Sequence, residues 1–277
     1  MNKGWHLLVH ECRLFWVAVQ FLTRLPVPKW VGEGFQTDWL SGCVRHFPLV
    51  GMGVGVFSAG VLWLALWVWP AWVAAVLAVA ASVWLTGAFH EDGLADTFDA
   101  LGGYVPRERA LTIMKDSRIG TYGAVALVLG LGLRIGLVAS LALVQPLAAV
   151  LALVAAHSMG RTAAVGMMVW LPYAGDAEHA KAKPLALAVP RSHAFVALVW
   201  CVLVWAGLVW AGHAGVAALS ASQWGWAVAG SLLVVVSVRR WLQQRLGGYT
   251  GDALGATEQL VEMAVLLALA STVAGGS

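Results

Sequence analysis

The sequence predicts an all-α protein: a polytopic integral membrane bundle of about seven transmembrane helices, with an N-terminal interfacial helix. The composition indicates this first, because 60% of the 277 residues are hydrophobic and only 11% are charged, against about 45–50% and about 25% in soluble domains. Long apolar runs recur along the whole chain, which excludes a disordered chain and a secreted protein with one signal peptide. The net charge of +3 is small, so no nucleic acid partner is expected.

Seven segments are apolar and long enough to cross a hydrocarbon core of about 30 Å, which takes about 20 helical residues. They are residues 47–69, 71–89, 121–144, 146–170, 194–212, 222–240 and 253–273. The short connections at Pro70 and Pro146 predict tight helical hairpins. Strands are not expected, because no segment alternates between polar and apolar residues. We interpret residues 1–277 as a single membrane domain.

The N-terminal segment, residues 1–46, precedes the first span and contains the predicted interfacial helix. From Leu14 apolar residues recur with helical spacing, while Arg13 and Arg24 fall on the opposite side. We expect this helix to lie on the membrane surface and to end at Pro26. An eighth span is the alternative interpretation.

The predicted loops alternate between two sides that differ in charge. One side receives residues 1–46 and the loops 90–120, 171–193 and 241–252, whereas the turns on the other side contain no Lys, Arg, Asp or Glu. The positive-inside rule places the charged side in the cytoplasm. We therefore predict a multi-pass protein of the cytoplasmic (inner) membrane, with its active site in the cytoplasmic loops of the bundle 47–273.

The strongest chemical signal is the acidic segment 86–103, directly after the second predicted span. Asp92, Asp96 and Asp99 are spaced i, i+4, i+7, so a helix places the three carboxylates on one face. Two carboxylates about 6 Å apart repel by roughly 3 kcal/mol at an effective dielectric constant of about 20, so this face needs a cation. Oxygen ligands favour Mg²⁺. His90 is a candidate base or only an interface residue, and a solvated helix end is the alternative for the segment.

Two other segments are candidates for phosphate binding. Lys115, Ser117 and Arg118 precede the third span, and the fork of a guanidinium suits phosphate oxygens. Anchoring of the chain on the cytoplasmic side is their alternative role. Thr250 and Gly251 open the last span, where glycine permits close backbone approach and a helix N-terminus favours an anion.

The last span also contains carboxylates. Asp252 is either a ligand or only a helix N-cap. Glu258 and Glu262 are spaced i, i+4 inside an apolar helix, where an unpaired carboxylate is costly and indicates function. We favour metal binding for Glu258. For Glu262 we favour a proton relay or ion pairing, with Arg134 and Arg161 as the buried cations.

Two further patterns are typical of helix packing. Gly51, Gly53 and Gly55 resemble a dinucleotide-binding loop, but no strand precedes them, so we expect close contact between helices. His157 and Arg161 are spaced i, i+4, which favours a polar contact between helices over a ligand site.

These motifs occur together, in order, in one known family. The sequence resembles the cobalamin synthase family, the adenosylcobinamide-GDP ribazoletransferases. The resemblance covers most of the chain and runs through FLTRLPVP (21–28), FPLVG (47–51), GAFHEDGLADTFDALGG (87–103), IMKDSRIGTYG (113–123) and GGYTGDALGATEQ (247–259). Departures such as Phe98, Ala100 and Tyr122 are conservative and remove no carboxylate.

The resemblance implies a Mg²⁺-dependent reaction. In it α-ribazole, or its 5′-phosphate, attacks the cobinamide-linked phosphorus of adenosylcobinamide-GDP, and GMP leaves. The implied metal ligands are Asp92, Asp96 and Asp99 with Asp252 or Glu258. Catalytic roles fall to Asp92, Asp96 and His90, and phosphate contacts to Lys115, Ser117, Arg118, Thr250 and Gly251. As partners we expect the two substrates and membrane lipid; a homo-oligomer and association with other nucleotide-loop assembly enzymes stay open.

Two other functions compete with this one. CDP-alcohol phosphotransferases also use Asp-Gly-x-x-Ala motifs and Mg²⁺ on membrane helices, but Asp96 stands where their motif has Arg. An ion-coupled transporter would explain polar residues such as Arg134 near the midplane, but it leaves the acidic segment without a role.

Overall fold

The computed structural model describes residues 3–175, 189–217 and 219–271. These residues form helices and loops, with one isolated bridge between Tyr173 and Tyr249. The α-helices are α1 (Lys3–Leu22), α2 (Asp38–Cys43), α3 (Phe47–Ala65), α4 (Ala71–Thr86), α5 (Phe89–Leu101), α6 (Arg107–Ile113), α7 (Thr121–Val144), α8 (Pro146–Trp170), α10 (Arg191–His213), α11 (Ala221–Arg245) and α12 (Gly251–Leu269). Two short 3₁₀ helices are η1 (Lys29–Val31) and η2 (Val44–His46). The predicted all-α class is confirmed.

Five helices in the described part of the chain are long and apolar enough to cross a membrane: Asp38–Ala65, which includes α2 and α3, and then α7, α8, α10 and α11. A sixth span results if α4 and α5, which are bent by 89°, are counted as one. The predicted segment 253–273 becomes α12, which is not among these helices and carries three carboxylates. The polytopic membrane bundle is confirmed, with five or six such helices instead of about seven.

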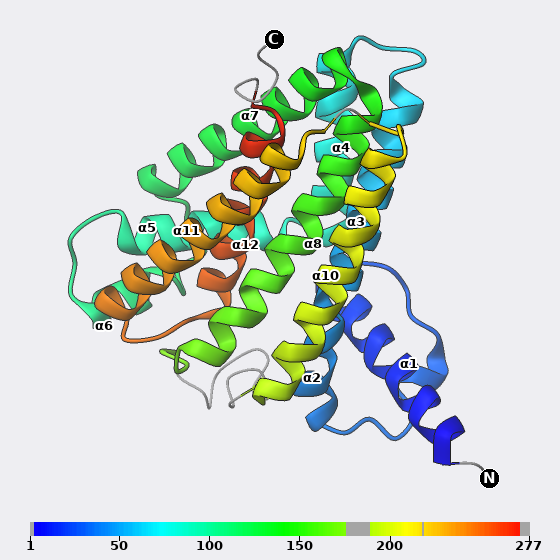
Figure 1. The fold of residues 1–277 in the computed structure, drawn as a ribbon. Coiled ribbons are helices and arrows are strands. Elements are labelled where there is room, and N and C mark those ends of the chain that lie inside the picture. Colours follow the sequence, from blue (N-terminus) through cyan, green and yellow to red (C-terminus); the bar gives the residue numbers. More distant parts are fainter. Residues whose placement is uncertain (1–2, 176–188, 218, 272–277) are drawn as a thin grey trace.

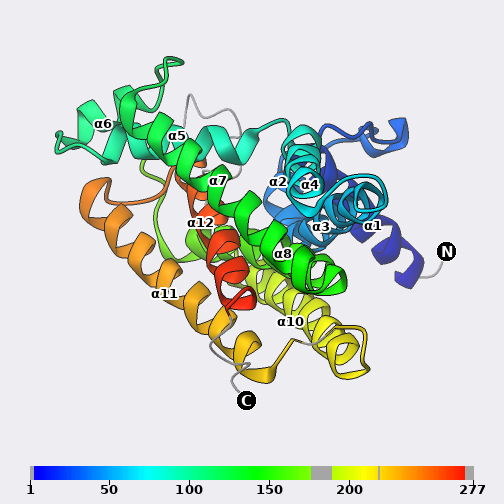
Figure 2. The same ribbon diagram turned by 90° about the horizontal axis from the view of Figure 1, so that it is seen from above.

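Helix α12 lies in the middle of the bundle. It packs against α5, α7, α8 and α11, and the view along the bundle shows these helices around it (Figure 2). Helix α3 packs against α8 and α4. Helix α10 runs beside α8 and α3 (Figure 1). Glu258 and Glu262 of α12 are therefore enclosed by neighbouring helices, whereas Asp252 lies in the first turn of α12.

A sharp elbow separates α4 from α5. Gly87 and Ala88 both adopt left-handed backbone conformations, with φ of 70° and 60°, and Ala88 is the one non-glycine residue with positive φ in the described chain. Arg24 covers the elbow: its backbone N–H donates to Leu85 O at 2.8 Å, and its side chain lies where a Cβ at Gly87 would stand. The N-terminal segment thus buttresses the turn that redirects the chain into α5.

Helix α1 begins well before the predicted interfacial stretch and ends at Leu22, four residues before Pro26. Leu14, Val17 and Ala18 are buried against the bundle, in agreement with the helical spacing of the apolar positions. The helix is not among those that meet the criterion for a spanning helix. The alternative of an eighth span therefore gains no support, and the interfacial position stays a prediction.

Glycines bring α3 and α8 into close contact. A Cβ at Gly51 would lie 2.3 Å from the carbonyl oxygen of His157, and one at Gly55 would lie 2.6 Å from Val154 Cα. Real Cβ atoms do not approach so closely, so these positions permit the contact only as glycine. The predicted role in helix packing is confirmed, and a dinucleotide loop is excluded.

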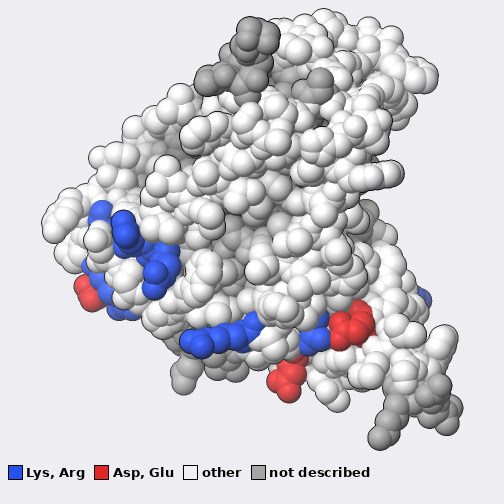
Figure 3. All heavy atoms as spheres, viewed as in Figure 1, with Lys and Arg blue, Asp and Glu red and all other residues white. Residues whose placement is uncertain are grey.

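On one face of the molecule, the charged side chains at the surface gather at one end (Figure 3). On the face drawn in Figure 3 the Lys, Arg, Asp and Glu side chains lie along the lower end, and the upper part is white. This distribution agrees with the prediction of one charged and one uncharged side. An uncharged surface beside a charged end suits a multi-pass membrane protein.

We expect Gly55→Ala to lower the free energy of unfolding by about 1–3 kcal/mol, the usual cost of overpacking a tight contact. Gly53→Ala is the matched control in the same helix, because its Cβ would have nothing within 4 Å and alanine favours a helix by about 1 kcal/mol over glycine. Thermal unfolding of the detergent-solubilised variants measures the difference. Equal melting temperatures would contradict the packing argument.

Candidate active site

The acidic helix α5 has two different faces. Asp92 is exposed and Asp96 and Asp99 are half-buried, whereas His90 and Glu91 are buried. With 100° between successive helical residues, the three aspartates share one side and the buried pair points away from it. The predicted acidic face therefore exists.

The acidic face of α5 begins where α5 crosses the start of α12. A Cβ at Gly93 would lie 2.6 Å from the carbonyl oxygen of Asp252, and one at Gly255 would lie 3.2 Å from His90 Cα. The two glycines let the helix backbones touch. The turn that carries Asp92 consequently lies against the first turn of α12, which carries Asp252.

Asp99 binds the start of another helix. Its Oδ2 accepts the backbone N–H of Gly120 at 2.7 Å and its Oδ1 accepts that of Gly123 at 2.8 Å. Gly120 is the N-cap residue of α7, so a carboxylate from α5 satisfies two N–H groups at the N-terminus of α7. The sequence predicts a metal ligand here, whereas both oxygens are already engaged in capping.

The predicted phosphate-binding residues before α7 are accessible. Lys115, Ser117 and Arg118 are exposed, and Arg118 Nη2 lies 2.6 Å from Asp116 Oδ2. This hydrogen bond holds the pKa of Asp116 at about 2, so its carboxylate is ionised at neutral pH. Because the pair is open to water, we expect it to contribute little to stability, and phosphate binding here stays a prediction. The contacts of Asp99 with Gly120 tie this loop to α5.

Thr250 caps α12, because its Oγ1 accepts the backbone N–H of Ala253 at 3.2 Å. The alternative interpretation of Asp252 as the N-cap is therefore wrong. Close backbone approach occurs at Gly248, where a Cβ would lie 2.1 Å from Pro172 O. Gly251 is exposed with open space around its Cβ position, so an anion can approach there.

The backbone of Tyr249 fixes the segment before α12 in place. Its N–H donates to Pro172 O at 2.9 Å, and its carbonyl accepts from Ala174 N at 2.8 Å. Burial, with a smaller contribution from Tyr173, raises the pKa of the Tyr249 phenol to about 12. This phenol is therefore not a base at neutral pH.

Glu258 lies inside the bundle and is paired. Its Oε1 is 2.5 Å from Arg161 Nη1 and its Oε2 is 2.9 Å from His90 Nε2. No more than 3% of any of these three side chains is exposed. The structure thus gives Glu258 two partners where the sequence favours metal binding. Among the described residues, no group of three or more His, Cys, Asp or Glu side chains is placed to hold a metal ion. A metal would need ligands from the substrate as well.

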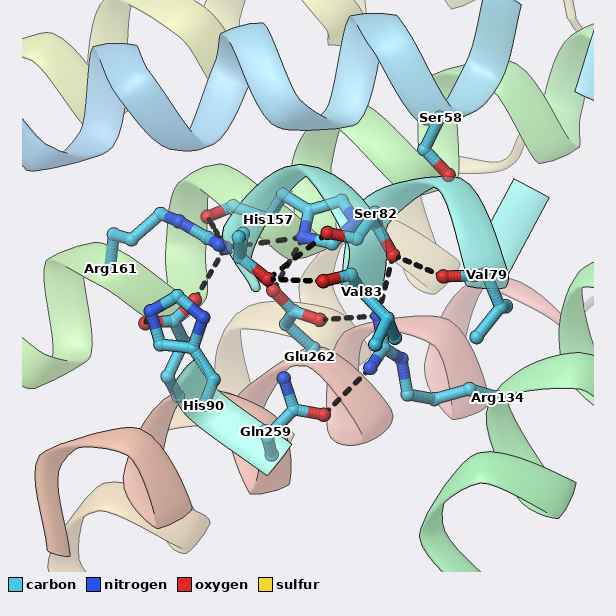
Figure 4. A network of polar contacts seen from close by, with 12 residues as sticks. Ser58, Val79, Ser82, Val83, His90, Arg134, His157, Arg161, Gln259 and Glu262 are labelled. Atoms are coloured by element: carbon cyan, nitrogen blue, oxygen red, sulfur yellow. Dashed lines mark hydrogen bonds and ion pairs between the residues drawn. The ribbon is translucent and has the colours of Figure 1, made fainter. Parts of the chain in front are cut away.

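Glu262 is the centre of a second set of buried contacts (Figure 4). Its Oε1 lies 2.6 Å from His157 Nδ1 and 2.7 Å from Arg161 Nη1, and its Oε2 lies 3.2 Å from Arg134 Nη2. The predicted ion pairing of Glu262 is confirmed, with both arginines. The polar contact between helices predicted for His157 and Arg161 is confirmed as well.

Sequence reasoning misses three members of this network: Ser82, Glu91 and Gln259, all of which contact Arg134. Glu91 has a local signal, since its spacing from the apolar Leu94 places it on the buried face of α5. Ser82 and Gln259 have none, because their partner is far away in the sequence.

Comparison with known proteins decides the family. Residues 14–270 match the family model described as cobalamin-5-phosphate synthase. The chain belongs to this family. An adenosylcobinamide-GDP ribazoletransferase of Leptothrix cholodnii is 52% identical, over 94% of this chain and 96% of its own. A protein of the same name from a Shewanella species is 42% identical, over 97% of this chain and 96% of its own length. Another, from Albidiferax ferrireducens, is also 42% identical, over 93% of this chain and 97% of its own length. No solved structure matches significantly.

Membership in the cobalamin-5-phosphate synthase family confirms the resemblance seen in the sequence. The matched region includes α5, the loop before α7 and all of α12, so every candidate residue lies within it. The family also decides against a CDP-alcohol phosphotransferase. Because Arg134, Arg161, Glu258 and Glu262 are paired with one another, they provide no evidence for an ion path.

We expect Asp99→Asn to destabilise this protein by about 0.5–1.5 kcal/mol, the usual net contribution of one hydrogen bond. The amide keeps one acceptor and turns its NH₂ group toward an N–H of α7. Asp92→Asn is the matched control on the same face and should melt like the parent protein, because Asp92 is exposed. Thermal unfolding in detergent compares them. An unchanged melting temperature for Asp99→Asn would refute the capping role.

Proposed function

We propose that this protein joins adenosylcobinamide-GDP and α-ribazole, or α-ribazole 5′-phosphate, giving adenosylcobalamin, or its 5′-phosphate, and GMP. A ribazole hydroxyl oxygen forms a bond to the cobinamide-linked phosphorus, the bond from that phosphorus to the GMP oxygen breaks, and a base takes the hydroxyl proton. The names of the relatives support this reaction. The observation that carries the proposal is the backbone contact between α5, at Gly93, and the first turn of α12, at Asp252, because both turns carry carboxylates.

The donor set suits Mg²⁺. Asp92, Asp96 and Asp252 offer only oxygen, and Mg²⁺ in proteins binds through one or two carboxylates together with substrate phosphates. We leave Asp99 and Glu258 out of the proposed set, because their oxygens already contact α7 and the buried cations. When bound, the ion would neutralise charge on the diphosphate and on the leaving GMP.

The chain's own groups would hold the phosphates and accept the proton. Lys115, Ser117 and Arg118 are exposed beside the N-terminus of α7, and their donors suit phosphate oxygens. The backbone N–H groups of Thr250 and Gly251 lie at the N-terminus of α12, and a helix N-terminus favours an anion. His90 faces Glu258 inside the bundle. We therefore assign the proton acceptor to the acidic face of α5, as Asp92 or Asp96, and not to His90.

We propose that the protein spans the cytoplasmic (inner) membrane with this site facing the cytoplasm. The spanning helices support a multi-pass arrangement. The charged end supports the orientation, since positively charged loops are retained in the cytoplasm. Nucleotide-linked substrates would then reach α5 and the start of α12 from the cytoplasm.

We expect the purified, detergent-solubilised protein to release GMP and form the cobalamin product from the two substrates, and to need Mg²⁺ for both. Asp92→Asn should lower kcat by about 10²-fold or more, the scale seen when a contact to developing charge is lost. Quantification of GMP and of the corrinoid product by chromatography measures both.

Asp38→Asn is the matched control, because Asp38 is an exposed carboxylate of α2, remote in sequence from α5. It should retain the parent activity. No turnover by the parent protein with Mg²⁺ would overturn the proposed reaction. Full activity of a folded Asp92→Asn variant would overturn the metal assignment alone.

A further inference from the structure

Arg134 is part of the buried polar network in Figure 4 and contacts more helices than its own. Its Nη1 donates to Glu91 Oε1 at 2.9 Å and to Gln259 Oε1 at 2.7 Å. Its Nη2 donates to Ser82 Oγ at 3.3 Å and lies 3.2 Å from Glu262 Oε2. One guanidinium on α7 therefore contacts α4, α5 and α12.

Helix α5 does not continue the direction of α4, so contacts along its own length must set its rotation. The two helices meet at 89°, through the left-handed residues Gly87 and Ala88. A helix of 13 residues joined by an elbow can rotate about its own axis unless its buried face is held. On that face the charged residue closest to the acidic face is Glu91.

Glu91 and Asp92 are neighbours in the sequence, so their side chains leave the helix about 100° apart. Glu91 is buried and Asp92 is exposed. A contact that fixes the direction of Glu91 therefore also fixes the direction of Asp92. Arg134 makes this contact directly, whereas Arg161 reaches α5 only through Glu258 and His90.

We propose that Arg134 is a positioning residue of the transferase: through Glu91 it sets the rotation of α5, and with it the direction in which Asp92 and Asp96 face the first turn of α12. Because Arg134 also contacts Gln259 and Glu262, it holds α5 and α12 by the same group. This inference rests on the proposed Mg²⁺-dependent reaction, and it adds a residue that touches neither metal nor substrate.

The first test compares the Mg²⁺ requirement of variants. Arg134→Lys keeps the charge but loses the planar fork that reaches several acceptors, and Glu91→Gln removes the charge at the other end of the contact. Each should raise the Mg²⁺ concentration for half-maximal activity by about tenfold or more, as for other residues that orient ligands. The double variant should be no worse than either single variant, because the two residues act as a unit.

Arg45→Lys and Glu11→Gln are the matched controls. Arg45 Nη1 and Glu11 Oε1 form another Arg–Glu pair, at 2.7 Å, between η2 and α1. Any loss of stability in these variants should leave the Mg²⁺ requirement unchanged.

The second test follows the rotation of α5 without any activity measurement. Leu94 is buried on the same side of α5 as Glu91. In a chain whose Cys12, Cys43 and Cys201 are replaced by Ala, the Leu94→Cys thiol should react slowly with a water-soluble maleimide. Adding Arg134→Lys should increase this rate at least several-fold, and adding Arg45→Lys should not.

The outcomes separate the two claims. An inactive parent protein would overturn the proposed reaction, while the maleimide rates would still test the rotation of α5. An active parent protein with an unchanged Mg²⁺ requirement and unchanged labelling in Arg134→Lys would overturn the positioning role. A raised Mg²⁺ requirement together with faster labelling would support it.

Discussion

The structure depends on the buried pairing of Arg134 and Arg161 with Glu91, Glu258 and Glu262. A charged side chain in the apolar core of a membrane protein is costly, and removing one partner leaves the other uncompensated. These five residues come from α5, α7, α8 and α12, so none of these helices can satisfy its own charge. The pairing explains how α12 can occupy the middle of the bundle although it carries Glu258 and Glu262 in its buried part.

The same pairing organises the candidate active site without being part of it. Its contacts hold the buried face of α5, and the aspartates lie on a different, more exposed face of the same helix. Close helix contact at Gly93 and Gly255 then brings the two backbones together. Asp99 extends the arrangement to a third element, since it ties the start of α7, and the exposed cations before it, to α5. A metal ion and a diphosphate could thus be held by three segments far apart in the sequence.

Much of the fold follows from local patterns, and much of the site does not. Hydropathy predicts α7 and α8 with their observed bounds, because an apolar run of spanning length has one stable form in lipid. The i, i+4, i+7 spacing predicts the acidic face of α5. The partners of Glu258 and the capping role of Asp99 depend on residues 21 to 168 positions away, which no spacing reveals. The left-handed Ala88 likewise has no local signal, so the elbow is not predicted.

The most direct test of the account is a structure of the protein with adenosylcobinamide-GDP and Mg²⁺ bound, determined with the Asp92→Asn variant if turnover prevents trapping. The account predicts the diphosphate between the acidic face of α5 and the first turn of α12, with Asp96 or Asp252 near the metal and Glu258 still paired with Arg161. A diphosphate held instead by Arg134 or Arg161, with the pairs of Glu258 and Glu262 broken, would contradict it.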